Sequence, residues 1–176
     1  MFRNILVTLD GSQYSEVILP VVAELAAGSG AGVTLFRAGD LPSATPEAPL
    51  DIQPPVVSRG AGGLYTPVIT APRYVETKAQ AIERREREMK EYLEERALPL
   101  RERGIEVQVA VDVGDGAGDR IIEYARSHPV DLIAMATHGH TGLRTLIFGS
   151  VTGKVLASGV RPLLLVRPHG LGHDAA

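Results

Sequence analysis

The sequence predicts an α/β protein with a doubly wound, five-stranded parallel sheet in the order 3-2-1-4-5 and helices on both faces. Three observations support this prediction. Short aliphatic and β-branched runs alternate along the chain with longer segments of helical periodicity. The short runs are apolar at successive positions, which is typical of strands buried on both faces. Because crossovers between parallel strands are right-handed, few other topologies remain.

Each expected strand is a run of aliphatic residues, and each expected helix repeats its apolar residues at helical spacing. Ser12 fits the N-cap of the first helix, and Pro20 is expected to kink that helix or shift its start. The expected strands cover residues 5–9, 33–36, 105–113, 130–136 and 162–166, and the expected helices cover residues 12–27, 75–103, 119–127 and 150–158.

The long central helix has one apolar stripe among densely mixed Glu and Arg residues, which are typical of a solvated face. The stripe consists of Val75, Ile82, Met89, Leu93, Ala97 and Leu100. Pro99 is expected to weaken the last turns. We expect Asp115 to start the next helix, and Ile121, Ile122 and Ala125 to face inward from it.

The length of 176 residues corresponds to one domain, which we expect over residues 1–168. Residues 39–78 are rich in Pro, Gly, Ser and Ala, and so long a structureless connection is unusual inside a domain. We interpret this segment as a flexible surface insertion. The alternative is that residues 64–70 form a short edge strand or a flap. Residues 169–176 are expected to be a disordered tail.

The composition excludes several functions. A net charge of −3 provides no general basic surface for nucleic acid or an anionic membrane, and aromatic residues are only 5% of the chain. Without cysteine, disulfides, thiolate metal sites and a cysteine nucleophile are excluded. No apolar run reaches the length of a signal or transmembrane segment. We therefore expect a cytoplasmic protein that binds neither nucleic acid nor membranes.

The segment after the fourth expected strand has the features of a phosphate-binding loop. Gly139 and Gly142 allow a tight turn and a close approach of the backbone to a ligand. Gly149 precedes a helix start, where unpaired N–H groups and the helix dipole favour an anion, and the Ser150 and Thr152 hydroxyls add donors. The spacing matches neither the P-loop nor the dinucleotide fingerprint. The alternative is that the glycines serve the turn alone.

Asp10 follows the first expected strand, so its carboxylate could accept hydrogen bonds from ribose hydroxyls or bind Mg²⁺. The alternative is that it only caps the first helix or forms an Asx turn with Gly11. In the predicted strand order, this loop and the loop after Ala136 flank the topological switch point. Ligands of doubly wound sheets bind at the carboxyl ends of strands at that point.

At these residues the chain resembles the universal stress protein family. Residues 5–12, Ile-Leu-Val-Thr-Leu-Asp-Gly-Ser, are similar to the opening strand and loop of that family. Residues 136–139, Ala-Thr-His-Gly, followed after nine residues by Gly149-Ser150, are similar to its ATP-binding signature G-x2-G-x9-G-[S/T]. Residues 162–166 resemble its closing strand. The resemblance implies an adenine nucleotide alpha hydrolase-like fold.

The resemblance also implies a set of contacts with ATP, accompanied by Mg²⁺. Asp10 would hold the ribose, the backbone of Ala38, just past the second strand, would meet the adenine, and Gly139 would line the ribose and phosphates. Apart from the resemblance, His140 or Arg144 in this loop could balance phosphate charge. The expected nucleotide-binding residues are Thr8, Leu9, Asp10, Ala38, Ala136, Gly139, His140, Gly149, Ser150, Val151 and Thr152. The family's ATP-binding branch further implies a homodimer joined through the last strand, and a stress-linked regulator that acts on an unknown protein partner.

One residue departs from the family signature, because Ala136 stands where the first glycine is expected. If that position needs a positive φ or a very close approach, affinity would fall. His138 and His140 could form a metal pair, but no third ligand is evident, so we predict no metal site. We find no catalytic base or Ser/His/Asp triad. The alternatives to a regulator without fast catalysis are a slow ATP-hydrolysing enzyme and a nucleotide-free dimeric interaction protein.

Overall fold

The computed structural model describes residues 2–41, 77–137 and 149–168. They form one five-stranded sheet in which every neighbouring pair of strands is parallel, in the order β3-β2-β1-β4-β5. The elements in chain order are β1 (Asn4–Thr8), α1 (Gln13–Glu16), α2 (Ile18–Ser29), β2 (Gly32–Gly39), α3 (Lys78–Glu102), β3 (Val107–Val113), α4 (Ala117–Ser127), β4 (Leu132–Ala136), α5 (Ser150–Ser158) and β5 (Leu163–Val166). The predicted fold class and strand order are confirmed.

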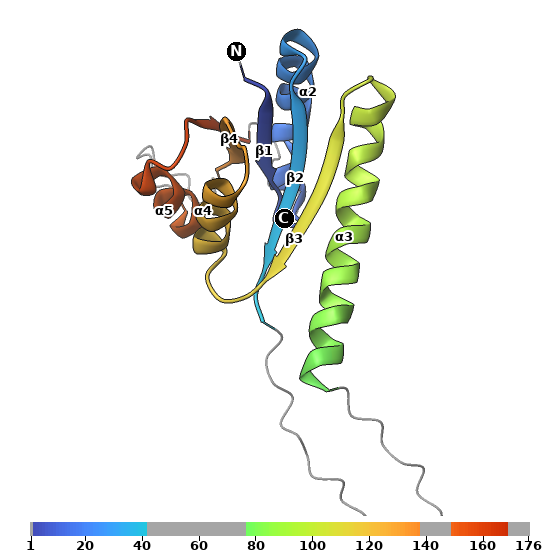
Figure 1. Ribbon diagram of the computed structural model, residues 1–176, viewed down its shortest axis with the longest axis vertical. Helices are drawn as coiled ribbons and strands as arrows, with labels where there is room; N and C mark the ends of the chain where they lie inside the picture. The colour runs from blue at the N-terminus through green and yellow to red at the C-terminus, as the bar shows by residue number, and fades with distance from the viewer. Residues whose placement is uncertain (1, 42–76, 138–148, 169–176) are drawn as a thin grey trace, which may run out of the picture.

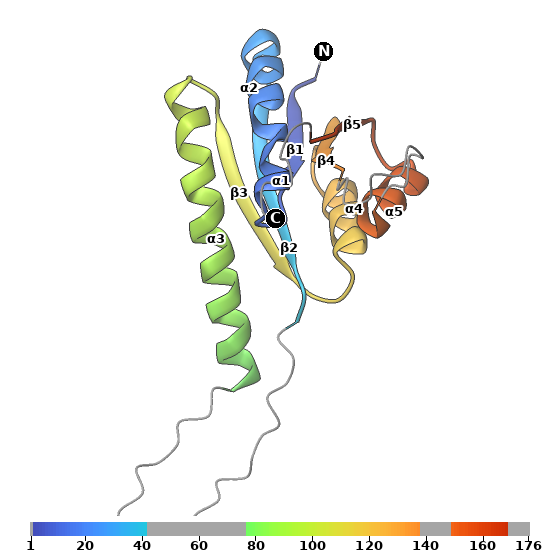
Figure 2. The same ribbon diagram turned by 180° about the vertical axis from the view of Figure 1, so that it is seen from behind.

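Helices cover both faces of the sheet. Helices α2 and α3 lie on one face, and α4 and α5 lie on the other (Figures 1 and 2). Alternate residues of each strand therefore enter different cores. Ile5 and Val7 of β1 pack with α2 and α3, whereas Leu6 between them packs with α4 and α5. This burial on both faces explains why the strand sequences are continuously apolar.

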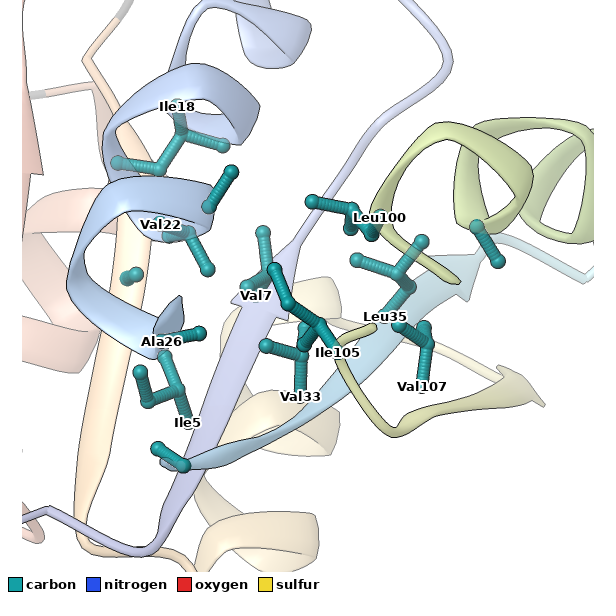
Figure 3. Close-up of a cluster of buried hydrophobic side chains, with 14 of the residues drawn as sticks. Ile5, Val7, Ile18, Val22, Ala26, Val33, Leu35, Leu100, Ile105 and Val107 are labelled. Carbon is teal, nitrogen blue, oxygen red and sulfur yellow. The ribbon is translucent and has the colours of Figure 1, made fainter. Parts of the chain in front are cut away.

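The larger core lies between the sheet and the pair α2 and α3. Figure 3 shows side chains from α2 directed toward side chains of β1 and β2, with the end of α3 closing the cluster. The residues labelled there are Ile5, Val7, Ile18, Val22, Ala26, Val33, Leu35, Leu100, Ile105 and Val107. Leu35 and Val22 are completely buried. This core holds β1 and β2 in place. It thereby positions Asp10, which follows β1, and Ala38, which lies near the end of β2.

The predicted first helix is divided into α1 and α2. Ser12 is its N-cap as predicted, because the Ser12 side chain accepts a hydrogen bond from the Ser15 backbone N–H. Pro20 is expected to kink this helix or shift its start, and the helix is interrupted at Val17, which is the C-cap of α1 and the N-cap of α2. Pro20 is the third residue of α2, in the first turn, where its missing N–H has no intrahelical acceptor to lose.

Helix α3 begins after a capping box formed by Thr77 and Gln80. Met89, Leu93, Ala97 and Leu100 are buried as predicted. Near the helix start, Ala81 is buried and Ile82 only half-buried, which corrects the predicted stripe. The first turns of α3 extend beyond the strand ends, so little sheet surface remains there to cover a large side chain (Figure 1). The helix continues through Pro99 to Glu102. Val75 lies outside the described residues.

The start of α4 also differs from the sequence prediction. Gly116, with φ 75°, is the N-cap of α4 and Ala117 its first residue, so Asp115 does not cap this helix. The prediction that Ile121, Ile122 and Ala125 face inward is confirmed by their burial. Most of the predicted insertion, residues 42–76, and the predicted tail, residues 169–176, lie outside the described residues.

Candidate nucleotide site

A pocket of about 290 Å³ opens at the carboxyl ends of β1, β2 and β4, beside the starts of α4 and α5. This is the topological switch point of the sheet, where the strand order reverses on either side of β1 and β4. Its lining residues are Thr8, Leu9, Asp10, Ser15, Ala38, Ala117, Ile121, Met135, Ala136, Gly149, Ser150, Val151 and Thr152. The pocket therefore brings together residues that lie far apart in the sequence.

Every predicted nucleotide-binding residue that the structure describes lines this pocket. The predicted residues in the lining are Thr8, Leu9, Asp10, Ala38, Ala136, Gly149, Ser150, Val151 and Thr152. Ala38 lies inside β2, one residue before its end, rather than just past it as the sequence suggested. Gly139 and His140 lie outside the described residues, as do His138, Gly142 and Arg144.

The loop after β1 is held by its own hydrogen bonds. The Ser12 backbone N–H donates to Asp10 Oδ1 over 2.8 Å, which closes an Asx turn. The buried Ser15 hydroxyl donates to the Ser12 carbonyl over 2.8 Å and accepts the Asp10 N–H over 3.3 Å. Gly11 has φ 91°, which disfavours a residue with a side chain there. The Asx turn considered as an alternative role for Asp10 is thus present, and it orients an exposed carboxylate at the pocket.

The start of α5 is open toward the pocket. Gly149 is its N-cap, with φ −56° and no side-chain cap hydrogen bond. Among the described residues, a Cβ atom at Gly149 would meet nothing within 4 Å. Neither backbone conformation nor packing against these residues therefore requires glycine at this position. A glycine there leaves space at the helix N-terminus, where free N–H groups favour an anion.

The start of α4 lies at the same pocket, since Ala117 is part of its lining. Its N-cap, Gly116, also forms no side-chain cap hydrogen bond. The two helices are joined by an ion pair in which Lys154 Nζ of α5 lies 2.6 Å from Asp119 Oδ2 of α4. Two helix starts thus converge on one cavity. The first turn of α4 carries the Asp119 carboxylate, whereas α5 has no acidic residue in its first turn, so the partial positive charge at the start of α5 is the one that favours a negatively charged ligand.

Ala136, the departure from the family signature, is the last residue of β4. No non-glycine residue in the described part of the chain has a positive φ, so this position does not need the conformational freedom of glycine. The next residue, Thr137, donates its N–H to the Val166 carbonyl over 2.9 Å, which continues the ladder between β4 and β5. One of the two reasons for expecting weaker binding at Ala136 is therefore removed.

The sequence analysis missed four residues of the lining. These are Ser15, Ala117, Ile121 and Met135. Ile121 was expected in the core, and it both packs with the α4 and α5 core and lines the pocket. Met135 precedes the signature loop, and Ala117 follows the Gly114-Asp115-Gly116 turn at the carboxyl end of β3. The sequence could have pointed to Ala117, because a glycine turn after β3 lies at the same edge of the sheet as the ends of the other parallel strands.

Two further findings concern the described residues. No helix there is long and apolar enough to cross a membrane. Residues 2–41, 77–137 and 149–168 also contain no group of three or more His, Cys, Asp or Glu side chains arranged to hold a metal ion.

The comparison with known families identifies the class of protein. The sequence profile of the universal stress protein family matches residues 64–167, which is more than half of the chain. The chain belongs to the universal stress protein family.

Individual relatives agree with this assignment. Universal stress protein YxiE of Bacillus subtilis is 25% identical over 167 residues, which cover 95% of this chain and 100% of YxiE. Universal stress protein MJ0577 of Methanocaldococcus jannaschii is 31% identical over 96 residues, covering 50% of this chain and 59% of that protein. The match to universal stress protein Slr1230 of Synechocystis is 35% identical but covers 39% of this chain and 23% of that protein.

Solved structures share the fold. The structure of MJ0577 has a TM-score of 0.67 at 23% identity and covers 97% of this chain and 99% of that one. A universal stress protein from Archaeoglobus fulgidus in complex with dAMP has a TM-score of 0.54 at 19% identity. This match covers 93% of this chain and 97% of that one. A family protein from Arabidopsis thaliana with AMP bound has a TM-score of 0.55 at 13% identity. This match covers 98% of this chain and 97% of that one.

Proposed function

We propose that this protein binds an adenine nucleotide, with ATP as the preferred ligand, and acts as a stress-response regulator without fast catalysis. The observation that carries the proposal is the pocket at the switch point, where Asp10, Ala38 and the start of α5 face one cavity. Structurally similar family members with bound AMP and dAMP support an adenine nucleotide as the ligand class.

Each part of the nucleotide has a counterpart in the pocket. We assign the ribose hydroxyls to the Asp10 carboxylate, which accepts hydrogen bonds, and the adenine to the strand end at Ala38. We assign the phosphates to the N–H groups at the start of α5 and to the hydroxyls of Ser150 and Thr152. In this proposal Gly139 and His140 complete the site from the loop before α5.

Mg²⁺ in this proposal arrives with the phosphates. Mg²⁺ prefers oxygen ligands, keeps several waters and is commonly held by one or two carboxylates together with substrate phosphates. The pocket offers Asp10 and the hydroxyl of Ser150 as oxygen donors. These donors fit a metal ion shared with ATP, in which the nucleotide supplies the remaining ligands.

A regulator needs a state that another protein can distinguish. ATP shifts a conformational equilibrium only by its difference in affinity for the two states. We propose that nucleotide joins the loop after β1 to the starts of α4 and α5, and that a partner protein binds this joined form. Lys154 of α5 and Asp119 of α4 form an ion pair, and in this proposal the pair helps the two helix starts to move together.

The nucleotide proposal is tested by calorimetry on protein from which nucleotide has been removed by unfolding and refolding, together with mass analysis of the material released. We expect a dissociation constant for ATP between low micromolar and submillimolar values, equivalent to roughly −5 to −8 kcal/mol. No binding at millimolar ATP would contradict the proposal and favour a nucleotide-free interaction protein. Hydrolysis that is lost in Asp10→Ala and Gly139→Val would favour the slow enzyme instead.

We further propose a homodimer formed through β5. This strand lies at the edge of the sheet, and all four of its apolar residues remain partly exposed. Its hydrogen bonds to β4 use the carbonyls of Pro162 and Val166, so the backbone groups of Leu163 and Leu165 point to the outer edge. A second copy of β5 could pair there.

The dimer is tested by sedimentation of two substitutions at one position. Leu165→Pro removes the outward N–H of β5, whereas Leu165→Ala only shortens the side chain. We expect the alanine variant to remain dimeric and the proline variant to sediment as a monomer while retaining its circular dichroism spectrum. A monomeric wild-type protein would contradict this proposal without affecting the nucleotide site.

A further inference from the structure

Two arginine side chains lie beside the nucleotide pocket but are not part of its lining. Arg37 belongs to β2 and Arg85 to α3. Ala38, the next residue after Arg37, packs against the α4 and α5 core, so the alternation of a strand directs Arg37 to the other face, toward α3. There the Arg37 guanidinium carbon lies 5.0 Å from the centroid of the Tyr92 ring.

Both guanidinium groups border the ends of β1 and β2. A Cβ atom at Gly11 would lie 2.5 Å from Arg37 Nη2, so this guanidinium rests directly against the loop that carries Asp10. A Cβ atom at Gly39 would lie 3.8 Å from Arg85 Nε, which places Arg85 at the end of β2. The start of α3 and the end of β2 lie at the same end of the sheet (Figures 1 and 2).

Most arginines of α3 and its C-cap form an ion pair with a glutamate. They are Arg84, Arg96 and Arg101 of the helix and Arg103 at the C-cap, whereas the exposed Arg87 forms none among the described residues. Within the described part of the chain, neither Arg37 nor Arg85 forms an ion pair with a carboxylate. Asp10 is the carboxylate that acts electrostatically on Arg37. Glu16, which accepts the Tyr92 hydroxyl, forms its ion pair with Arg96.

The electrostatics of Arg37 agree with this geometry. Burial and the positive charge of Arg85 lower the pKa of the Arg37 guanidinium, and the Tyr92 hydroxyl and Asp10 offset this in smaller part. Two like charges held near each other on a partly buried surface repel. An anion placed between them would relieve that repulsion, and arginine is well suited to phosphate because its planar donors bind two oxygens at once.

We propose that Arg37 and Arg85 form a second anion subsite, which binds a phosphate carried on the ribose of the nucleotide. The inference rests on the proposed function, in which the ribose lies at Asp10. In this proposal Asp10 binds one of the two ribose hydroxyls, and a phosphate on the other extends past Gly11, the residue against which Arg37 rests. This subsite adds affinity for adenine nucleotides that carry a phosphate at the ribose 2′ or 3′ position in addition to phosphate at the 5′ position.

Calorimetry tests this subsite by comparing AMP with adenosine 3′,5′-bisphosphate and adenosine 2′,5′-bisphosphate. We expect one bisphosphate to bind about tenfold more tightly than AMP, a preference worth roughly 1.4 kcal/mol. In Arg37→Gln and in Arg85→Gln, the affinity for the bisphosphate should fall toward the affinity for AMP. Arg37→Lys should retain part of the preference for the bisphosphate. Arg87→Gln is the matched control, because it removes the same charge from the exposed face of α3 and should leave the preference unchanged.

The ratio of the bisphosphate affinity to the AMP affinity separates the subsite from general effects on folding, since partial unfolding weakens the binding of both ligands alike. AMP binding without any preference for a bisphosphate overturns the subsite alone. A preference that survives in both glutamine variants overturns it as well. Inorganic phosphate that competes with the bisphosphate but not with AMP supports a subsite for the phosphate group itself. If neither AMP nor a bisphosphate binds, the nucleotide proposal fails and the subsite fails with it.

Discussion

The Asp10 carboxylate accepts the Ser12 backbone N–H over 2.8 Å, so the residue assigned to the ribose also shapes its own loop. Two substitutions separate these roles. Asp10→Asn keeps a side-chain oxygen for the turn but loses the charge, whereas Asp10→Ala loses both. Because hydrogen bonds to charged groups contribute about 1.5–3 kcal/mol, we expect Asp10→Ala to weaken ATP binding by roughly tenfold or more.

The asparagine variant is expected to bind ATP with an affinity between those of the wild type and the alanine variant. Calorimetry measures the affinities, and thermal unfolding shows whether the turn is retained. Equal ATP affinity in all three proteins would show that Asp10 acts only within its own turn.

Gly149 provides a second test, directed at the phosphate end of the pocket. Its φ of −56° suits any residue, and the described residues leave space for a Cβ atom there. We expect Gly149→Ala to reduce ATP affinity about tenfold, while the free energy of unfolding changes by less than about 1 kcal/mol.

Gly28→Ala in α2 is the matched control for Gly149→Ala, since a Cβ atom there also meets nothing within 4 Å. It should leave ATP affinity unchanged and stabilise the fold slightly, because alanine is the better helix former. Unaltered ATP binding by Gly149→Ala would show that the phosphates do not bind at the start of α5.

The packing of α3 can be measured with two leucines of the same helix. Leu93 is completely buried, and Leu98 is 56% exposed. We expect Leu93→Ala to lower the free energy of unfolding by about 2–5 kcal/mol and Leu98→Ala to change it by less than about 0.5 kcal/mol. Urea unfolding measures both. A similar small effect at both positions would mean that α3 is not packed against the sheet as described.

The pH dependence of stability should contain a contribution from Asp131. Its Oδ2 accepts the backbone N–H groups of Arg3 and Asn4 over 2.8 and 3.0 Å, and these bonds lower the pKa of the Asp131 carboxyl below its usual value. Folding therefore favours the ionised form. The stabilisation is complete above the unfolded pKa of about 3.9 and is lost as the pH falls through the lower native value.

We expect the urea midpoint of the wild type to fall more steeply than that of Asp131→Asn between about pH 5 and pH 2. Asp115→Asn serves as the control, because the described residues offer its side chain no hydrogen bond. Its curve should follow the wild type. Parallel curves for the wild type and Asp131→Asn would contradict the assignment.

Much of the architecture could be predicted because its signals are local. The N-cap at Ser12, the exact extent of α5 over Ser150–Ser158 and the inward face of α4 each depend on residues within a few positions of one another. Strand order followed from the alternation of elements and the handedness of crossovers. The edge at which a ligand would bind followed in turn, because the carboxyl ends of β1 and β4 must flank the switch point. The individual contacts were implied by the resemblance to the family.

Other features depend on how distant elements approach each other. Burial of Ala81 in place of Ile82 reflects where α3 passes the end of the sheet, which periodicity alone does not show. Ser15 and Ala117 join the pocket because α1 and α4 begin at the same edge. The contact of Arg37 with Gly11 joins residues 26 positions apart in sequence through the pairing of β1 with β2.

The sequence by itself determined the α/β fold, the strand order and the edge of the sheet at which a ligand would bind, since these depend on periodicity, turn residues and chain handedness. Only the tertiary structure decided which helix starts meet at the pocket and that Ala136 needs no positive φ. It also placed Arg37 and Arg85 at the ends of β1 and β2, where neither forms an ion pair with a carboxylate among the described residues. These features are set by packing between elements, and the distance between two side chains on different elements is not encoded in either local pattern.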